Sequence, residues 1–161
     1  MKTRLALALS FLLAGTAAAQ STAPTGLTLW GGLGTEVFVI PGATLGLSAT
    51  VAQLPRMNVD LRGSASAYLL PVPDVNGPFT AFNAELLFSG RNSNFNLYGG
   101  PSVGTVLGGL WTVGATGGLR GQFDGGNLGW FSEAHLRAAF DSAGLFPFPL
   151  VGGTFGVTYR F

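Results

Sequence analysis

The stretch that decides the fold is MNVDLRGSASAYL, residues 57–69. Small or apolar side chains occupy its odd positions from Val59 to Leu69, whereas its even positions carry Asp60, Arg62 and further polar groups. A period of two is the pattern of a β-strand whose two faces meet different surroundings. A helix would scatter the two charges among apolar neighbours, so the stretch predicts a strand.

The same alternation recurs along the chain. It is clear in residues 79–89, 111–123, 128–140 and 151–161, and weaker in 26–40, 43–54 and 95–107. Clusters of turn-forming residues separate these segments: Pro41-Gly42, Pro55, 71–78, 91–94, Gly108-Gly109, 124–127 and 141–149. Eight strands of this length joined by short turns predict an all-β fold, an eight-stranded antiparallel up-and-down barrel.

The first residues have the pattern of a secretory signal peptide. Lys2 and Arg4 precede an apolar run at 5–15, and Ala17 and Ala19 form a small-residue cleavage site. The alternative is an uncleaved anchor helix, but the apolar run is short for about 30 Å of hydrocarbon. We therefore expect residues 1–19 to be removed and residues 20–161 to form the barrel domain, exported with the signal peptide cleaved near Ala19.

Composition excludes several classes of protein. Charged residues make up only 9% of the 161 residues, there is one His, and there is no Cys. An ordinary soluble domain has about 25% charged residues. One His without Cys supplies no set of metal ligands, so we expect no metal or cofactor. The balanced charge offers no electrostatic footprint for nucleic acid.

All charged residues of the predicted barrel domain, 20–161, fall on the polar faces of the predicted strands or in turns. The predicted turns hold Arg56, Asp74, Arg91, Asp124 and Asp141. Parity places a second set on the polar faces: Glu36, Asp60, Arg62, Glu85, Arg120, Glu133, His135, Arg137 and Arg160. A transmembrane barrel turns its apolar faces toward lipid and its polar faces toward the lumen, so this second set is predicted to form a polar lumen network. Arginine suits such a network because its planar guanidinium can bind a carboxylate through two hydrogen bonds.

The predicted apolar faces carry aromatic residues near the strand ends. If both termini are periplasmic, these residues form two belts, as lipid interfaces select. The predicted membrane-interface girdle comprises Phe82, Phe88, Phe95, Trp111, Phe123, Trp130 and Phe140. The same orientation places connections 71–78 and 141–149 outside the cell.

Hydrophobic or aromatic residues occupy alternate positions of the last predicted strand, at Phe155, Val157, Tyr159 and Phe161. With this C-terminus as the most specific feature, residues 20–161 resemble the small bacterial outer-membrane β-barrels of the OmpA and OmpX type. Those proteins end in a strand with a terminal Phe and outward hydrophobic or aromatic residues at alternate positions. The resemblance implies an assembly signal in this strand, an outer-membrane location, and partners comprising outer-membrane lipid, the secretion translocon and the barrel-assembly machinery. We also expect a monomer.

Three functions remain open on the sequence. The first is a structural or interaction barrel whose lumen is filled by side chains, as expected for eight strands. The second is transport of a small or hydrophobic ligand, or a narrow channel, because inward glycines such as Gly32, Gly104 and Gly118 leave volume. The third is a lipid-modifying enzyme, but its candidate Ser132 lies on the face opposite to His135. We therefore expect no catalytic residues.

One segment offers a different fold. No charge occurs between Arg91 and Arg120, and Gly100, Gly104 and Gly108 have the G-x-x-x-G spacing of a membrane helix pair. The segment is also rich in Thr and Val, contains Pro101 and is divided by Gly108-Gly109. A hairpin of two lipid-facing strands fits these features better.

Overall fold

A computed structural model describes residues 26–37, 39–69, 78–91, 95–106, 109–123, 126–141 and 148–161. Within these residues the elements are β1 (Leu27–Glu36), β2 (Ile40–Gln53), β3 (Met57–Tyr68), β4 (Phe79–Gly90), β5 (Phe95–Val106), β6 (Leu110–Gln122), β7 (Leu128–Phe140) and β8 (Phe148–Arg160). The predicted signal peptide lies outside them. In the described part of the chain, no helix is long and apolar enough to cross a membrane.

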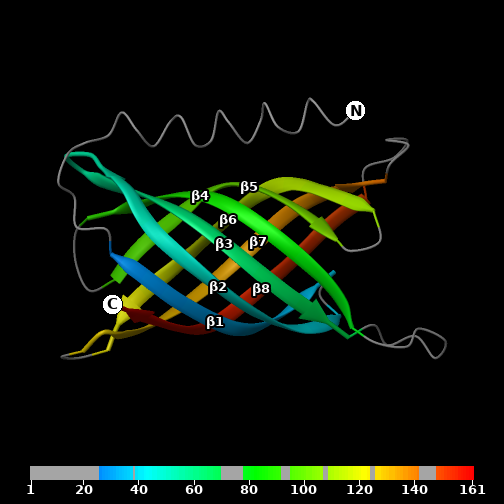
Figure 1. The fold of residues 1–161 in the computed structure, drawn as a ribbon, viewed down its shortest axis with the longest axis horizontal. Coiled ribbons are helices and arrows are strands. Elements are labelled where there is room, and N and C mark those ends of the chain that lie inside the picture. The colour runs from blue at the N-terminus through cyan, green and yellow to red at the C-terminus, as the bar shows by residue number, and fades with distance from the viewer. Residues whose placement is uncertain are drawn as a thin grey trace.

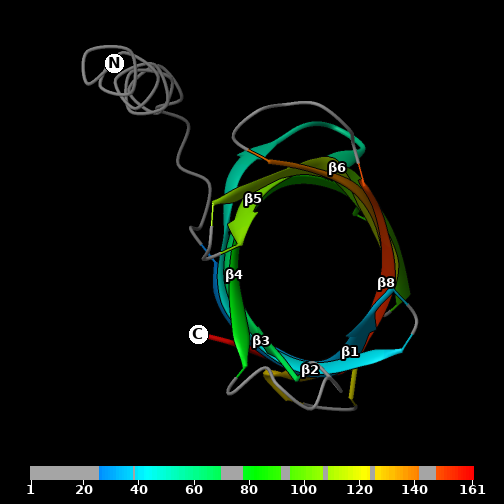
Figure 2. The same cartoon turned by 90° about the vertical axis from the view of Figure 1, so that its right-hand side faces the viewer.

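Each strand pairs antiparallel with the next, and β1 pairs with β8, so the sheet closes (Figure 1). The view along the barrel axis shows the strands as a continuous ring (Figure 2). The prediction of an eight-stranded antiparallel barrel is confirmed. The strands are 10 to 14 residues long, and a tilted strand needs about 9–11 residues to cross the hydrocarbon of a membrane.

The two faces of each strand differ as the period of two predicts. In β4 every odd residue from Ala81 to Ser89 is buried, and every even residue from Phe82 to Gly90 is exposed. In β3, Asp60 and Arg62 are buried while Leu61 and Gly63 are exposed. Because a one-residue slip would move every side chain to the other face, this pattern fixes the register of the barrel.

The predicted turn at Pro41-Gly42 is wrong. Strand β2 begins at Ile40, and Pro41 and Gly42 pair with Thr35 and Gly34 inside the β1–β2 ladder. The chain turns earlier, at Val37 and Val39, and Val37 has a φ of 49°. A proline is compatible with an extended strand when it lies near the first residue of that strand. Gly42 faces inward beside the Tyr68 ring, so both residues serve the strand rather than the turn.

Strand β8 is longer than predicted. It begins at Phe148, and Phe148 and Pro149 pair with Ala139 and Ala138 of β7. Pairing with β7 therefore extends through Pro149, which was predicted to lie in the loop 141–149. Residues 142–147 of that loop lie outside the described part of the chain.

The charge-poor segment forms strands and not a helix pair. Strands β5 and β6 are paired from Phe95–Gly121 to Val106–Leu110. Pro101 lies beside a gap in the β4–β5 ladder, between the pairs Glu85–Ser102 and Phe88–Gly99. A proline has no N–H to donate, which accounts for a break in pairing at this point.

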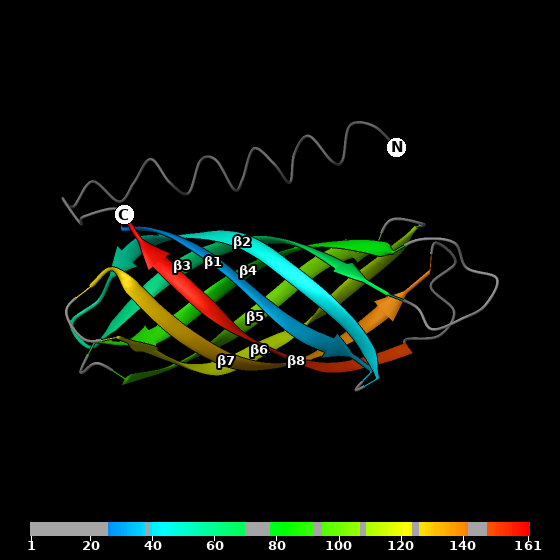
Figure 3. The same cartoon turned by 90° about the horizontal axis from the view of Figure 1, so that it is seen from below.

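The two ends of the barrel differ in their connections. Gly26 and Phe161 lie at the terminal end, where β2 ends and β3 begins, β4 ends and β5 begins, and β6 ends and β7 begins. At the opposite, distal end β1, β3, β5 and β7 end and β2, β4, β6 and β8 begin. Figure 3 shows the C-terminus and the start of β1 at the same end.

Candidate functional site

The lumen holds eight of the nine residues predicted for the lumen network. Glu36, Asp60, Arg62, Glu85, Glu133, His135 and Arg137 are buried. The side chain of Arg120 is 27% exposed. Arg160 has the same inward parity but lies exposed at the terminal end, where it lines a cavity.

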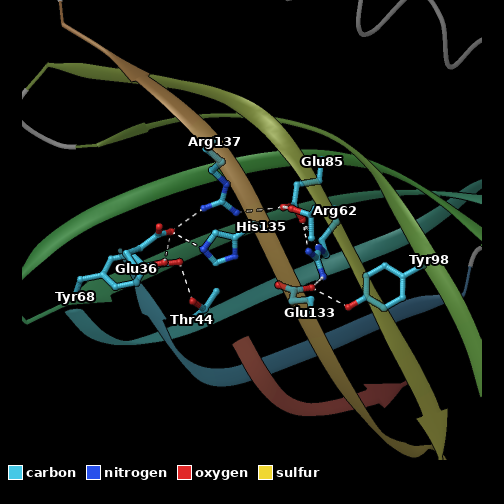
Figure 4. Close-up of polar contacts among 11 residues, drawn as sticks. Glu36, Thr44, Arg62, Tyr68, Glu85, Tyr98, Glu133, His135 and Arg137 are labelled. Carbon is cyan, nitrogen blue, oxygen red and sulfur yellow. Dashed lines mark hydrogen bonds and ion pairs between the residues drawn. The ribbon is translucent and has the colours of Figure 1, made fainter. Parts of the chain in front are cut away.

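Arg62 of β3 is the centre of the network. It forms an ion pair with Glu85 of the neighbouring β4. Its Nη1 lies 2.8 Å from Oε2 of Glu133, which comes from β7 across the lumen. The hydroxyl of Tyr98 donates a 2.8 Å hydrogen bond to the same Glu133 oxygen (Figure 4). Two carboxylates from opposite walls therefore offset the free-energy cost of burying this guanidinium.

Arg137 of β7 continues the network toward the distal end. Its Nη2 lies 3.4 Å from Oε1 of Glu85, and its Nη1 lies 3.1 Å from Oε1 of Glu36. The hydroxyl of Tyr68 donates to the same Glu36 oxygen at 3.1 Å. Nε2 of His135 is 2.8 Å from it, although the imidazole is not aligned for a hydrogen bond. Glu85 therefore joins the Arg62 and Arg137 halves into one central cluster: Glu36, Arg62, Glu85, Glu133, His135 and Arg137.

A separate ion pair lies nearer the terminal end. Nη2 of Arg120 is 3.0 Å from Oδ2 of Asp60 and donates to the Ser89 hydroxyl at 2.6 Å. The hydroxyl of Thr50 donates to Oδ1 of Asp60 at 2.7 Å. Both oxygens of this carboxylate are thus engaged.

The centre of the lumen also contains aromatic side chains, which were not among the predicted lumen residues. The Arg62 guanidinium lies 4.4 Å from the centre of the Trp30 ring and 5.8 Å from that of Tyr98. Phe131 meets Trp30 edge to face at 5.4 Å. Trp30, Tyr98 and Phe131 are all buried, together with Leu87. A guanidinium over an aromatic face is stabilised by cation–π attraction, which suits a site with little water.

Inward glycines lie beside the largest inward side chains. A Cβ added at Gly46 would come 2.6 Å from Cζ2 of Trp30, and one at Gly118 would come 2.8 Å from Cβ of Glu133. The paired positions are Trp30–Gly46, Tyr68–Gly42, Tyr98–Gly118, Phe131–Gly156, Glu133–Gly118, His135–Gly152 and Arg137–Gly114. The interpretation that inward glycines leave the lumen empty is therefore wrong at the centre, because neighbouring side chains fill the space.

The cavities along the described lumen differ in volume between its two ends. The cavity within the central cluster is about 10 Å³, and the one around Trp30, Leu87 and Phe131 is about 30 Å³. A distal cavity beside Tyr68 and Phe79 is about 40 Å³. A cavity needs at least about 10–15 Å³ to hold a water molecule. By contrast, two cavities at the terminal end measure about 210 and 270 Å³.

The outer surface carries the predicted girdle residues. Phe82, Phe88, Phe95, Trp111 and Phe123 are exposed, and Trp130 and Phe140 are half-buried. Trp111 and Phe140 pair near the distal end, whereas Phe95 and Trp130 meet near the terminal end at 5.9 Å. These residues lie on β4–β7 or, in the case of Phe123, directly after β6. Phe155 and Tyr159 of β8, and Phe161 directly after it, are further exposed aromatic residues. The outward positions of β1–β3 carry no aromatic side chain.

The candidate catalytic pair is separated by the barrel wall. Ser132 is exposed on the outer face of β7, and His135 is buried in the lumen. A general base must lie within hydrogen-bond reach of the group that it activates, so these two residues do not form a nucleophile–base pair. No group of three or more His, Cys, Asp or Glu residues in the described ranges is placed to hold a metal ion.

Comparisons with known proteins identify the fold but no family. No protein-family model matches the chain, and no curated protein matches it. A de novo designed transmembrane β-barrel superposes with a TM-score of 0.57 at 12% identity, covering 88% of this chain and 100% of that one. Ail, the attachment invasion locus protein of Yersinia pestis, superposes with a TM-score of 0.54 at 13% identity, covering 86% of this chain and 100% of that one. A further structure, of the outer-membrane protein Ail in a phospholipid bilayer nanodisc, gives a TM-score of 0.52. The chain therefore has the fold of a small transmembrane β-barrel.

Proposed function

We propose that this protein is an integral barrel of the bacterial outer membrane, with a structural or interaction role and a lumen closed by its own side chains. The location is supported by the signal-peptide pattern at residues 1–19, by the terminal strand ending in Phe161, and by the fold shared with the outer-membrane protein Ail. The resemblance to OmpA- and OmpX-type barrels points the same way.

One observation carries the membrane assignment. Every charged residue within the eight strands has inward parity, and large apolar side chains cover the outside, with Leu97 72% and Phe155 63% exposed. A soluble barrel would expose charges and bury such residues, because burial of apolar surface stabilises the folded state. The observed distribution is stable when lipid is the outer solvent.

The closed lumen rests on the central cluster. Its carboxylates and guanidiniums come from β1, β3, β4 and β7, so they cross-link opposite walls where the remaining cavities are about 10 and 30 Å³. Ions or solutes would have to break buried ion pairs to pass. We therefore place a structural or interaction role before transport, and we propose no catalysis.

The proposed partners follow from the same assignment. Outer-membrane lipid surrounds the apolar face, and the secretion translocon and barrel-assembly machinery act during biogenesis. We propose a monomer, since a closed barrel leaves no strand edge for pairing with another copy.

Gel migration of unheated and boiled protein tests the membrane-barrel assignment. The folded barrel should resist detergent until boiled and therefore migrate differently before and after heating, with a β-sheet circular dichroism spectrum. A mainly helical spectrum, or recovery of a stable monomer without detergent, would refute the assignment.

Planar-bilayer recording tests the closed lumen separately. Protein shown to be folded by its heat-dependent migration should give little or no conductance, because porin-scale channels need about sixteen strands or more. Large, stable single-channel steps would show an open lumen and make transport the leading function.

A further inference from the structure

The terminal end of the lumen contains a wide polar vestibule that the closed-lumen proposal does not use. Two cavities of about 210 and 270 Å³ lie there and share Thr28, Asn58, Arg120 and Arg160 in their walls. Their inner side meets the narrow region of about 30 Å³ around Trp30 and Arg62. The vestibule therefore narrows toward the centre of the lumen.

The vestibule has an excess of positive charge. Arg91, Arg120 and Arg160 line it, and Asp60 is the single acidic side chain among the described lining residues. Asp60 already accepts hydrogen bonds from Arg120 and Thr50. Within the described ranges Arg160 takes part in none of the ion pairs, and Arg91 uses its Nη1 to bind the Leu54 carbonyl at 3.1 Å.

We propose that this vestibule binds a small soluble anion with a phosphate-type oxyanion group. The three guanidiniums approach from β6, β8 and the end of β4, so they present donors from different walls. One guanidinium can bind both oxygens of a carboxylate, whereas a tetrahedral oxyanion has enough oxygens to accept hydrogen bonds from several guanidiniums. Asn58, Asn96 and Thr158 add neutral polar groups to the wall. The volume leaves room for a small organic group on the anion.

The test titrates inorganic phosphate, and separately glycerol 3-phosphate, into protein folded in a phosphate-free neutral detergent at constant ionic strength. Amide and Arg side-chain NMR shifts report the binding site. We expect saturable shifts at Arg120 and Arg160. Arg160→Gln should weaken binding by about tenfold or more, the scale of a lost charged hydrogen bond.

Arg56→Gln is the matched control. Arg56 is exposed in the 54–56 connection at the same end, lies in neither cavity wall, and loses the same charge on substitution. Its affinity for phosphate should stay close to that of the wild type. Absence of saturable shifts in the wild type, or an equal loss in both variants, would overturn the proposal. Heat-dependent gel migration confirms that each variant remains a folded barrel, so a failed anion site is distinguishable from a failed fold.

A second arm separates a soluble anion from a lipid headgroup. The same shifts are measured in nanodiscs of phosphatidylcholine, with and without phosphatidylglycerol. Dissolved phosphate should produce the shifts in both membranes. Shifts that require phosphatidylglycerol and do not appear with dissolved phosphate would overturn the proposal in favour of a lipid site.

Discussion

Trp30 and Gly46 are partners across β1 and β2, and their sizes are complementary. The indole occupies the space that a side chain at Gly46 would need, with Cζ2 2.6 Å from the position of an added Cβ. We expect Gly46→Ala to destabilise the barrel by about 1–3 kcal/mol, the usual cost of overpacking. Equilibrium unfolding in lipid vesicles measures it.

Gly63→Ala is the control for this prediction. Gly63 pairs with Leu47 in the adjacent β2–β3 ladder, but it faces outward, and an added Cβ would meet nothing within 4 Å. The substitution should be neutral or slightly stabilising, because alanine loses less backbone freedom than glycine on folding. Equal losses for the two variants would contradict the proposed filling of the lumen.

Glu133 holds Arg62 from across the lumen. Glu133→Gln leaves the guanidinium with Glu85 as its remaining carboxylate. Breaking a buried pair costs about 3–5 kcal/mol, and we expect the lower part of this range because Glu85 stays in place. Arg160→Gln, at the solvated vestibule, should lose much less stability in the same titration. A stability of Glu133→Gln equal to the wild type would show that the cluster is not structural.

At this scale the sequence predicted where the charges lie but not which residues they contact. Alternation alone gave Asp60, Arg62, Glu85 and Glu133 their inward parity. It did not place Trp30 or Tyr98, because β1 and β5 are rich in glycine and carry no clear alternation. It also left out Phe131, because a large apolar ring on the polar face of β7 departs from the alternation of apolar and polar residues. The available signal was an inward-facing aromatic residue paired with a glycine on the neighbouring strand. This signal can be recognised only once it is known which residues pair across the strands.

At the scale of the strand, the sequence predicted which segments form strands and which side chains face inward. It predicted less well where each strand begins and ends. The interval 128–140 matches β7, whereas Pro41-Gly42 and Phe148-Pro149 proved to lie in strands. Turn preferences describe isolated segments, and a neighbouring strand with free backbone groups can extend pairing through a proline near a strand end. Such tertiary pairing is not visible in a local pattern.

The terminal strand provides a prediction about assembly. The N–H of Phe161 donates to the Leu27 carbonyl at 3.0 Å, and its exposed ring meets Tyr159 at 5.1 Å. Deletion of Phe161 should lower the amount of heat-modifiable protein in outer membranes more than Phe161→Tyr does, because the tyrosine keeps an outward aromatic ring at the chain end. Equal membrane yields for the deletion and the wild type would argue against an assembly signal.

Strand β7 provides a test of membrane depth. Leu136 is exposed on the outer face near the middle of β7, and Leu27 is exposed at the terminal end of β1. Leu136→Arg should destabilise the barrel by about 2–4 kcal/mol, and Leu27→Arg by about 0–1 kcal/mol, since the cost of a cation falls toward the interface. Denaturant titration in vesicles compares them; similar small losses would indicate that the outer face meets water.

At the scale of the whole molecule, the barrel has an inverted and asymmetric organisation. Its outside is apolar, and its centre is filled by the central cluster and by aromatic side chains. Two cavities of about 210 and 270 Å³ lie at the terminal end. The outward aromatic residues lie on β4–β8 or directly after β6 and β8, so the girdle does not surround the barrel evenly. The central claim is that lipid surrounds the outside while side chains close the interior.

The three tryptophans allow the most direct test of this claim. Trp111 is outward and exposed, whereas Trp30 is inward and 4% exposed. One variant keeps Trp30 through Trp111→Phe and Trp130→Phe, and a second keeps Trp111 through Trp30→Phe and Trp130→Phe. The measurement is fluorescence quenching by lipids brominated near the headgroup, on variants shown to be folded by gel migration. The account predicts strong quenching of Trp111 and little quenching of Trp30; stronger quenching of Trp30, or no quenching of Trp111 in the folded protein, would contradict it.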